Sequence, residues 1–192
     1  MGKKTTMSNR LSRLESVTRP EVKINALNSG AFDTIGSISG TLLHPQRTSN
    51  GTSRDTRIGD KIKTRNIRFQ AIVKMPANPS SSTCAVRILV LRSRKSFATT
   101  SDMPTWYGSV DEDKFFVIKD VLTQVSAVAG TSGSTGSTLK KIQFNIPTGL
   151  RKLSYDSTAS VSPLNNEYLI YMFAENQSAE VAWNFQHYYI DN

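Results

Sequence analysis

Hydrophobic and polar positions alternate along two long segments of the chain. In residues 67–75, Ile67, Phe69 and Val73 alternate with polar or charged side chains such as Arg68 and Gln70. Residues 181–190 alternate in the same way. A period of two is typical of a β-strand with one buried face. The pattern therefore predicts two strands that each turn one face to a core and the other to solvent.

Four further segments are rich in apolar residues: 84–91, 115–118, 142–146 and 168–173. We interpret them as strands that are buried on both faces. Residues 33–43 are a weaker strand candidate, with Ile35 and Ile38 among small residues. Clusters of Gly, Pro, Ser, Thr and Asn separate these segments, and residues 129–138 are predicted to form a low-complexity loop.

Seven or eight such strands predict an all-β fold, either a sandwich or a barrel. The connection over residues 94–113 is too long for a hairpin, and it favours Greek-key crossovers. It therefore indicates a single jelly roll rather than an up-and-down barrel. A chain of 192 residues fits one domain. We place this domain at residues 24–192 and predict a separate N-terminal arm over residues 1–23.

The arm is polar and basic. Residues 8–17 place Leu11 and Leu14 one turn apart after Ser8, a candidate N-cap, and Pro20 ends any helix there. A helix of ten residues is marginal in water. We therefore expect a disordered segment or short helix that orders on binding nucleic acid, with a frayed, solvated terminus as the alternative. Six cationic residues of the arm are predicted to contact nucleic acid: Lys3, Lys4, Arg10, Arg13, Arg19 and Lys23.

Charge is unevenly distributed. The chain carries 24 Lys and Arg against 15 Asp and Glu, a formal net charge of +9. A second basic cluster spans residues 54–68 and adds Arg65 and Arg68 to the predicted nucleic-acid contacts. Residues 153–192 contain five carboxylates and no Lys or Arg, and we expect these carboxylates at subunit contacts or on the outside. A basic surface attracts polyanions of any sequence, although charge that serves solubility alone fits the composition equally well.

Signatures of catalysis are scarce, and we expect that the protein is not an enzyme. The two histidines, His44 and His187, form no transition-metal motif. His187 shares the apolar side of its strand and is predicted to be a packed or interface histidine rather than a catalyst. The single cysteine, Cys84, is predicted to be buried, and the lack of a disulfide partner fits a reducing compartment. Acidic residues 111–113 lack the spacing of an EF-hand and are interpreted as a solvated turn. No apolar run approaches the roughly 20 residues that span a bilayer, so we expect no membrane partner.

Several segments occur in an order and at a spacing that resemble a known family. The chain resembles capsid proteins of the satellite tobacco necrosis virus type. The stretch that begins at Arg57 is also similar to capsid proteins of small circular single-stranded DNA (Rep-encoding) viruses. The segments that carry the resemblance are Glu21 with residues 26–30, residues 57–62, 86–92 and 116–121, residues 146–150 with Tyr155, and residues 189–192.

The resemblance implies a fold, an assembly and a location. It implies one jelly roll in which two four-stranded antiparallel sheets pack face to face. It also implies a homo-oligomeric T=1 icosahedral shell that packages single-stranded RNA or DNA through its arm and basic inner surface. The implied location is the virion, with the host cytoplasm or nucleus during assembly. Relative to the circular-DNA viruses, the arm lacks a dense run of arginines.

The resemblance further implies calcium at the subunit interfaces. The ligands would be the Asp191 side chain and the backbone oxygens of Ile58 and Lys61, with Glu21 as a second carboxylate at a symmetry axis. Thr52 and Ser53 stand where the family has an aspartate pair, a departure that concerns one of its calcium sites.

Two other classes of protein are weighed against a capsid protein. A jelly-roll binding module, lectin-like or cytokine-like, would use the same fold without a large particle and without a basic arm. A cupin-like metalloenzyme would need a histidine-rich ligand set, which two distant histidines do not supply.

Overall fold

The computed structural model describes residues 21–36, 40–79, 81–94, 103–129, 135–157, 159–176 and 179–191. Within these ranges the regular secondary structure consists of β-strands, ten in number. None of the described residues belongs to a helix long and apolar enough to cross a lipid bilayer. The strands are β1 (Val22–Asn28), β2 (Asp33–Thr34), β3 (Thr41–Leu43), β4 (Lys61–Lys74), β5 (Thr83–Ser93), β6 (Phe115–Ala129), β7 (Thr135–Ser137), β8 (Lys140–Ser154), β9 (Tyr168–Ala174) and β10 (Glu180–Asp191).

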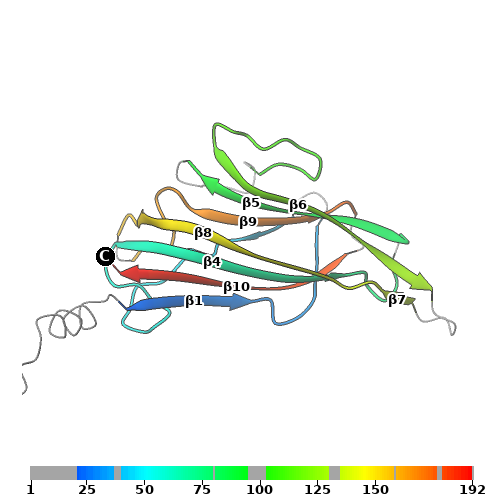
Figure 1. Cartoon of the computed structure of the whole chain (residues 1–192), viewed down its shortest axis with the longest axis horizontal. Helices are drawn as coiled ribbons and strands as arrows, with labels where there is room; N and C mark the ends of the chain where they lie inside the picture. Colours follow the sequence, from blue (N-terminus) through cyan, green and yellow to red (C-terminus); the bar gives the residue numbers. More distant parts are fainter. Residues whose placement is uncertain are drawn as a thin grey trace, which may run out of the picture.

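The strands form two antiparallel sheets, as predicted for an all-β sandwich. Sheet A has the order β1-β10-β4-β8, with β2 also paired to β10, and sheet B has the order β3-β9-β5-β6-β7. Figure 1 shows β8, β4, β10 and β1 running side by side. Each sheet thus has five strands, one more than the four that the resemblance implies, because the short strands β2 and β7 are added. The predicted loop over residues 129–138 is wrong at Thr135–Ser137, because β7 pairs there with the end of β6.

Four of the strand pairs are nested along the chain. β1 pairs with β10, β3 with β9, β4 with β8 and β5 with β6. The first strand thus pairs with the last, and each pair lies inside the previous one in sequence. Both sheets consequently combine strands from the two halves of the chain.

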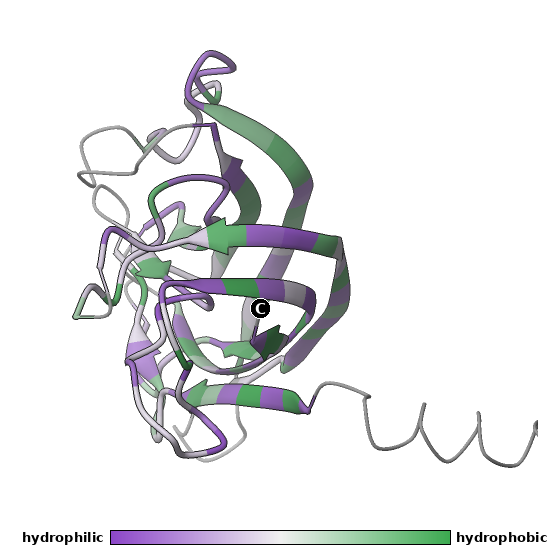
Figure 2. Cartoon of the chain, turned by 90° about the vertical axis from the view of Figure 1, so that its left-hand side faces the viewer, coloured by the Kyte–Doolittle hydropathy of each residue, from purple (hydrophilic) through white to green (hydrophobic). Residues whose placement is uncertain are grey.

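Alternate side chains of the two sheets meet in the core. Phe69 on β4 and Phe144 on β8 have ring centroids 4.9 Å apart, and both belong to the core cluster that also contains Phe185 of β10 and Ile88 of sheet B. Figure 2 shows the alternation of hydrophilic and hydrophobic residues along the strands. The two strands predicted from a period of two, residues 67–75 and 181–190, are confirmed by β4 and β10.

Burial on both faces is confirmed for only some of the apolar segments. Every residue of β9 is buried, and so are seven of the eleven residues of β5. Their outer face is covered by the connection before β6, where Met103 and Trp106 pack on Leu89 and Phe173. For residues 115–118 and 142–146 the prediction is wrong, because the outer side chains of β8 and most of those at the start of β6 are exposed. Packed cover over a strand, rather than its composition, decides whether both faces are buried.

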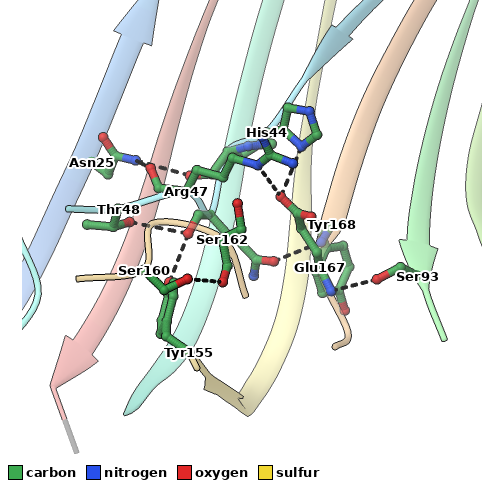
Figure 3. Close-up of polar contacts among 12 residues, drawn as sticks. Asn25, His44, Arg47, Thr48, Ser93, Tyr155, Ser160, Ser162, Glu167 and Tyr168 are labelled. Carbon is green, nitrogen blue, oxygen red and sulfur yellow. Dashed lines mark hydrogen bonds and ion pairs between the residues drawn. The ribbon is translucent and has the colours of Figure 1, made fainter. Parts of the chain in front are cut away.

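A cluster of polar groups is buried at one end of the sandwich (Figure 3). The Glu167 side chain is 1% exposed, and its Oε1 lies 3.0 Å from His44 Nδ1 and 3.2 Å from Arg47 Nε. The backbone N–H groups of Glu167 and Tyr168 donate to Ser93 Oγ and Gln46 Oε1. We call these six residues the Glu167 cluster. Buried polar groups are tolerated when they are hydrogen-bonded, and this cluster joins the segment before β4 to the start of β9.

We predict that Glu167→Gln lowers the free energy of unfolding by about 1–3 kcal/mol, because the buried partner of the Arg47 guanidinium and the His44 ring loses its charge. Urea titration followed by tryptophan fluorescence measures the change. Glu112→Gln, at an exposed position, is the matched control and should leave the midpoint nearly unchanged. Equal midpoints for both variants would contradict a stabilising role for the cluster.

Candidate nucleic-acid interface

Three of the eight predicted nucleic-acid contacts lie on sheet A. Lys23 is in β1, and Arg65 and Arg68 are in β4. Arg65 and Arg68 share one strand, whereas Lys23 is separated from β4 by β10. The other five lie outside the described residues: Lys3, Lys4, Arg10, Arg13 and Arg19.

Lys23 departs from the expectation. It is buried, and its Nζ lies 2.8 Å from Asp191 Oδ2 and 2.9 Å from the Thr56 carbonyl oxygen. Strand β1 already begins at Val22, so Lys23 is part of the sandwich rather than of an arm that ends at residue 23. Its charge is neutralised inside the subunit and is not presented to a ligand.

Asp191 has both carboxylate oxygens engaged within the subunit. Oδ1 accepts a hydrogen bond from the Ile58 backbone N–H at 3.1 Å, and Oδ2 faces the Lys23 ammonium. Calcium requires six to eight oxygen ligands, but here Ile58 turns an N–H toward Asp191 and a lysine holds the cation position. Among the described residues no group of three or more His, Cys, Asp and Glu side chains could hold a metal ion. The chain's own residues at Asp191 do not fit a calcium site, and we leave calcium out of the proposed function.

Glu21 and Lys61 are the other two residues of the expected calcium set. Glu21 is exposed and directly precedes β1. Lys61 is exposed at the first position of β4, where its Cα partner is Ser154. The Glu21 carboxylate is not among the groups that pair with Asp191 in the part of the chain that the structure describes. The expected ligand at Lys61 is its backbone oxygen, and Lys61 directly precedes Ile62, the Cα partner of Asp191.

Arg65 is exposed because of a bulge in β4. Both neighbouring strands shift register between Thr64 and Asn66, so Arg65 has no Cα partner on either side. A bulge leaves the extra residue unpaired and re-aims its side chain. Arg68, three residues further along β4, is also exposed, with its guanidinium 5.3 Å from the centroid of the Tyr188 ring.

The end of sheet A near Arg65 gathers cations from two strands. Lys63 on β4 and Lys152 on β8 are Cα partners, and Arg151 is paired to Thr64. Like charges placed opposite each other on neighbouring strands are destabilising. None of the five cations at this end forms an ion pair among the described residues, so the site favours an anionic ligand. We call them the basic end of sheet A: Lys61, Lys63, Arg65 and Lys152 on its outer face, and Arg151, which shares the face of its Cα partner Thr64.

Sequence reasoning missed Arg151 and Lys152 as candidate contacts. They are almost 90 residues away from Lys63 in the sequence, and only the register of β8 against β4 brings them together. The dipeptide lies directly after Gly149 and Leu150, which both have positive φ, at 63° and 55°. The one signal of this local geometry in the sequence was Gly149, because glycine accepts a positive φ without steric cost.

Arg57, in the same basic segment of the sequence, has a structural role. It is fully buried, its guanidinium lies 3.9 Å from the centroid of the Tyr155 ring, and it donates to the carbonyl oxygens of Thr48 and Ser157. Burial raises the pKa of Tyr155, whereas the nearby Arg57 charge opposes that shift. Arg57 thus ties the loop before β4 to the loop after β8, and it is not available to a polyanion.

Two residues that sequence reasoning set aside as structural are confirmed as such. His187 is fully buried, its Nε2 lies 2.8 Å from Thr64 Oγ1, and burial lowers its pKa to about 3. A histidine with this pKa is neutral at physiological pH. Cys84 is also fully buried, within the core between the sheets.

Comparison with known proteins adds no family. Neither a scan against protein-family models nor a search of curated proteins found a match to the chain. The function is therefore argued from fold, charge and side-chain geometry.

We predict that Asp191→Asn lowers the free energy of unfolding by about 2–4 kcal/mol, because it leaves the buried Lys23 ammonium without its counter-charge. The asparagine Oδ1 keeps the hydrogen bond from Ile58, so the change isolates the charge. Asp156→Asn, at an exposed position, is the control and should be nearly neutral. Thermal unfolding with and without a chelator measures the effect.

The added variant Lys23→Met in the Asp191→Asn background should recover part of the loss, because the uncompensated charge is gone. Chelator should change none of these unfolding curves. A chelator effect on the native sequence that disappears in Asp191→Asn would overturn the assignment of Lys23 as the cation at this position.

Proposed function

We propose that the chain is a viral capsid protein that assembles into a T=1 icosahedral shell and packages single-stranded nucleic acid. The observation that carries the proposal is the unpaired basic end of sheet A on a two-sheet β-sandwich. Binding through phosphate needs no base sequence, which suits a genome that presents a different sequence to every subunit. On this proposal residues 1–20 extend the same cationic surface, and the protein is a structural component rather than an enzyme.

The nested strand pairing supports a jelly roll as the finer description of the fold. When β2 and β7 are set aside, eight strands remain, four in each sheet, and the chain alternates between the sheets at most connections. A jelly roll is a double sheet of eight strands built from two Greek keys, and viral capsid domains are among its uses. This arrangement also agrees with the resemblance of the sequence to capsid proteins of the satellite tobacco necrosis virus type.

Exposed apolar side chains on the described surface support self-association. Leu122 is 67% exposed, Tyr107 is 87% exposed, and Leu164 and Val161 are exposed on the loop before β9. Apolar and aromatic side chains are typical of the buried centre of a protein interface. Surfaces of this kind in several parts of one subunit fit a shell, in which each copy contacts several neighbours.

The purified full-length protein should form particles of uniform size that contain nucleic acid. Negative-stain microscopy and the ratio of absorbance at 260 and 280 nm measure both properties, and digestion with RNase or DNase then identifies the nucleic acid. A soluble monomer without nucleic acid under assembly conditions would overturn the proposal.

The basic end predicts a change in salt dependence. Lys63→Gln with Lys152→Gln removes two proposed phosphate contacts. Each contact to a single strand contributes about 0.7 to the slope of log Kobs against log salt concentration, so the slope should become shallower by about 1.4. Fluorescence anisotropy with a labelled single-stranded oligonucleotide measures this slope. The control pair is Lys114→Gln, directly before β6, with Lys119→Gln on β6; it removes the same formal charge beside sheet B and should leave the slope unchanged. Equal changes for the two pairs would show that only net charge matters.

A second candidate function is a jelly-roll binding module, lectin-like or cytokine-like. The observation that favours it is a hollow of about 430 Å³ on the outside of sheet B, lined by Arg87, Trp106, Tyr107, Asp120 and Leu122. Arg87 and Asp120 form a bidentate ion pair at its floor, at 3.1 and 2.8 Å. A binding module would remain a monomer or small oligomer in the microscopy experiment.

A further inference from the structure

The outer face of sheet A, which points away from sheet B, carries two rows of hydrogen-bonding side chains. The residues of each row are Cα partners on neighbouring strands. The first row crosses β1, β10, β4 and β8 and consists of Asn28, Asn184, Gln70 and Gln143. The second row lies beside it on β10, β4 and β8 and consists of Gln186, Arg68 and Asn145. We call these seven residues the carboxamide face.

The direction of these side chains follows from the core. Phe69, Phe144 and Phe185 lie between the two rows in sequence and belong to the core between the sheets. Because successive residues of a strand point to opposite faces, their neighbours point outward. All members of the carboxamide face are exposed except Gln70, which is half-buried at its centre. The face forms a shallow hollow of about 620 Å³.

The carboxamides keep much of their hydrogen-bonding capacity for a ligand. Asn184 Nδ2 donates to Gln70 Oε1 at 3.5 Å, the Tyr188 hydroxyl donates to Gln186 Oε1 at 2.8 Å, and Asn66 Nδ2 donates to Asn145 Oδ1 at 2.9 Å. Each carboxamide has two N–H donors and an oxygen with two lone pairs. These three contacts use a small part of that capacity, so the face presents donors and acceptors together.

The charge of the face fits a polyanion that also has neutral polar groups. Among the described residues that line the hollow there is no Asp or Glu, and the one charged residue is Arg68. Lys141 lies two residues before Gln143 on β8, beyond the first row. The basic end of sheet A lies beyond the second row, at the other end of β4 and β8. The ligand that this pattern fits is therefore anionic at the ends of the face and rich in donors and acceptors over its centre.

We propose that the carboxamide face binds the unpaired bases of single-stranded nucleic acid, while the basic end binds its phosphates. Unpaired bases offer donors and acceptors on their edges. One carboxamide or guanidinium group can form two hydrogen bonds with such an edge. A second copy of this chain fits less well, because the centre of a protein interface is typically apolar or aromatic. The inference rests on the proposed function, since it names the part of the genome that the inner surface would contact.

The test compares two labelled oligonucleotides of equal length and equal charge, one of mixed sequence and one in which every nucleotide is abasic. Fluorescence anisotropy with the full chain should give an affinity for the base-bearing strand that is higher by about tenfold, the scale of one or two good base contacts. Gln70→Val with Asn184→Val should remove this difference and leave the affinity for the abasic strand unchanged. Gln124→Val, exposed on β6 in sheet B, is the matched control and should keep the difference.

The outcomes separate this inference from the proposed function. Equal affinity of the native chain for both strands, with particles still formed, would overturn the inference and leave the capsid proposal intact. A preference for bases that persists in Gln70→Val with Asn184→Val would place the base contacts elsewhere and also overturn it. Loss of particles in that double variant, with the base preference unchanged, would assign the face to contacts between copies. A native chain that binds neither strand and forms no particle would overturn both proposals. Circular dichroism of each variant establishes that the fold is retained.

Discussion

The register of β4 against β10 and β8 is the constraint on which both faces of sheet A depend. Phe69, Phe144 and Phe185 are Cα partners across these three strands and lie in the core. Because side chains alternate with a period of two, a slip of one residue would turn carboxamides inward and phenylalanines outward. Burial contributes about 1.5–3 kcal/mol for each such side chain. The aromatic row therefore holds the carboxamide face in position as well as the core.

A single irregularity in β4 reconciles two demands on that strand. Thr64 and Ile67 are both buried, although three positions separate them and strict alternation would place them on opposite faces. The extra residue, Arg65, restores the alternation on the far side of the bulge. Thr64 can then meet the neutral His187 inside, while Arg65 joins the basic end outside. The bulge thus connects the packing of the interior to the charge of the surface.

The sequence was sufficient for features that depend on local pattern and insufficient for those that depend on pairing. Alternation in residues 67–75 and 181–190 predicted β4 and β10, and the apolar residues on the same side of the strand as His187 predicted that it is packed. Lys23 illustrates what the sequence alone could not predict. We interpreted it as a ligand contact because it lies in a basic segment, but it pairs with Asp191, near the other end of the sequence, on the adjacent strand β10. Arg151 and Lys152 were missed for the same reason, because their position beside Lys63 is a property of register alone.

The distribution of charge in space differs from that along the sequence, and the difference bears on function. Residues 153–192 form an acidic end of the sequence, but Glu167, Glu180 and Asp191 each pair with cations from earlier in the chain. Glu167 is also buried rather than at the surface as expected. These pairings remove carboxylates that would repel a polyanion, while the basic end keeps its cations unpaired. Phosphates alone would hold any nucleic acid at that end, whereas carboxamides, which both donate and accept, can satisfy whichever base lies over them. On the proposed function, a surface with both properties would favour unpaired over paired strands without reading a sequence, because only an unpaired strand leaves the Watson–Crick edges of its bases free for the sheet.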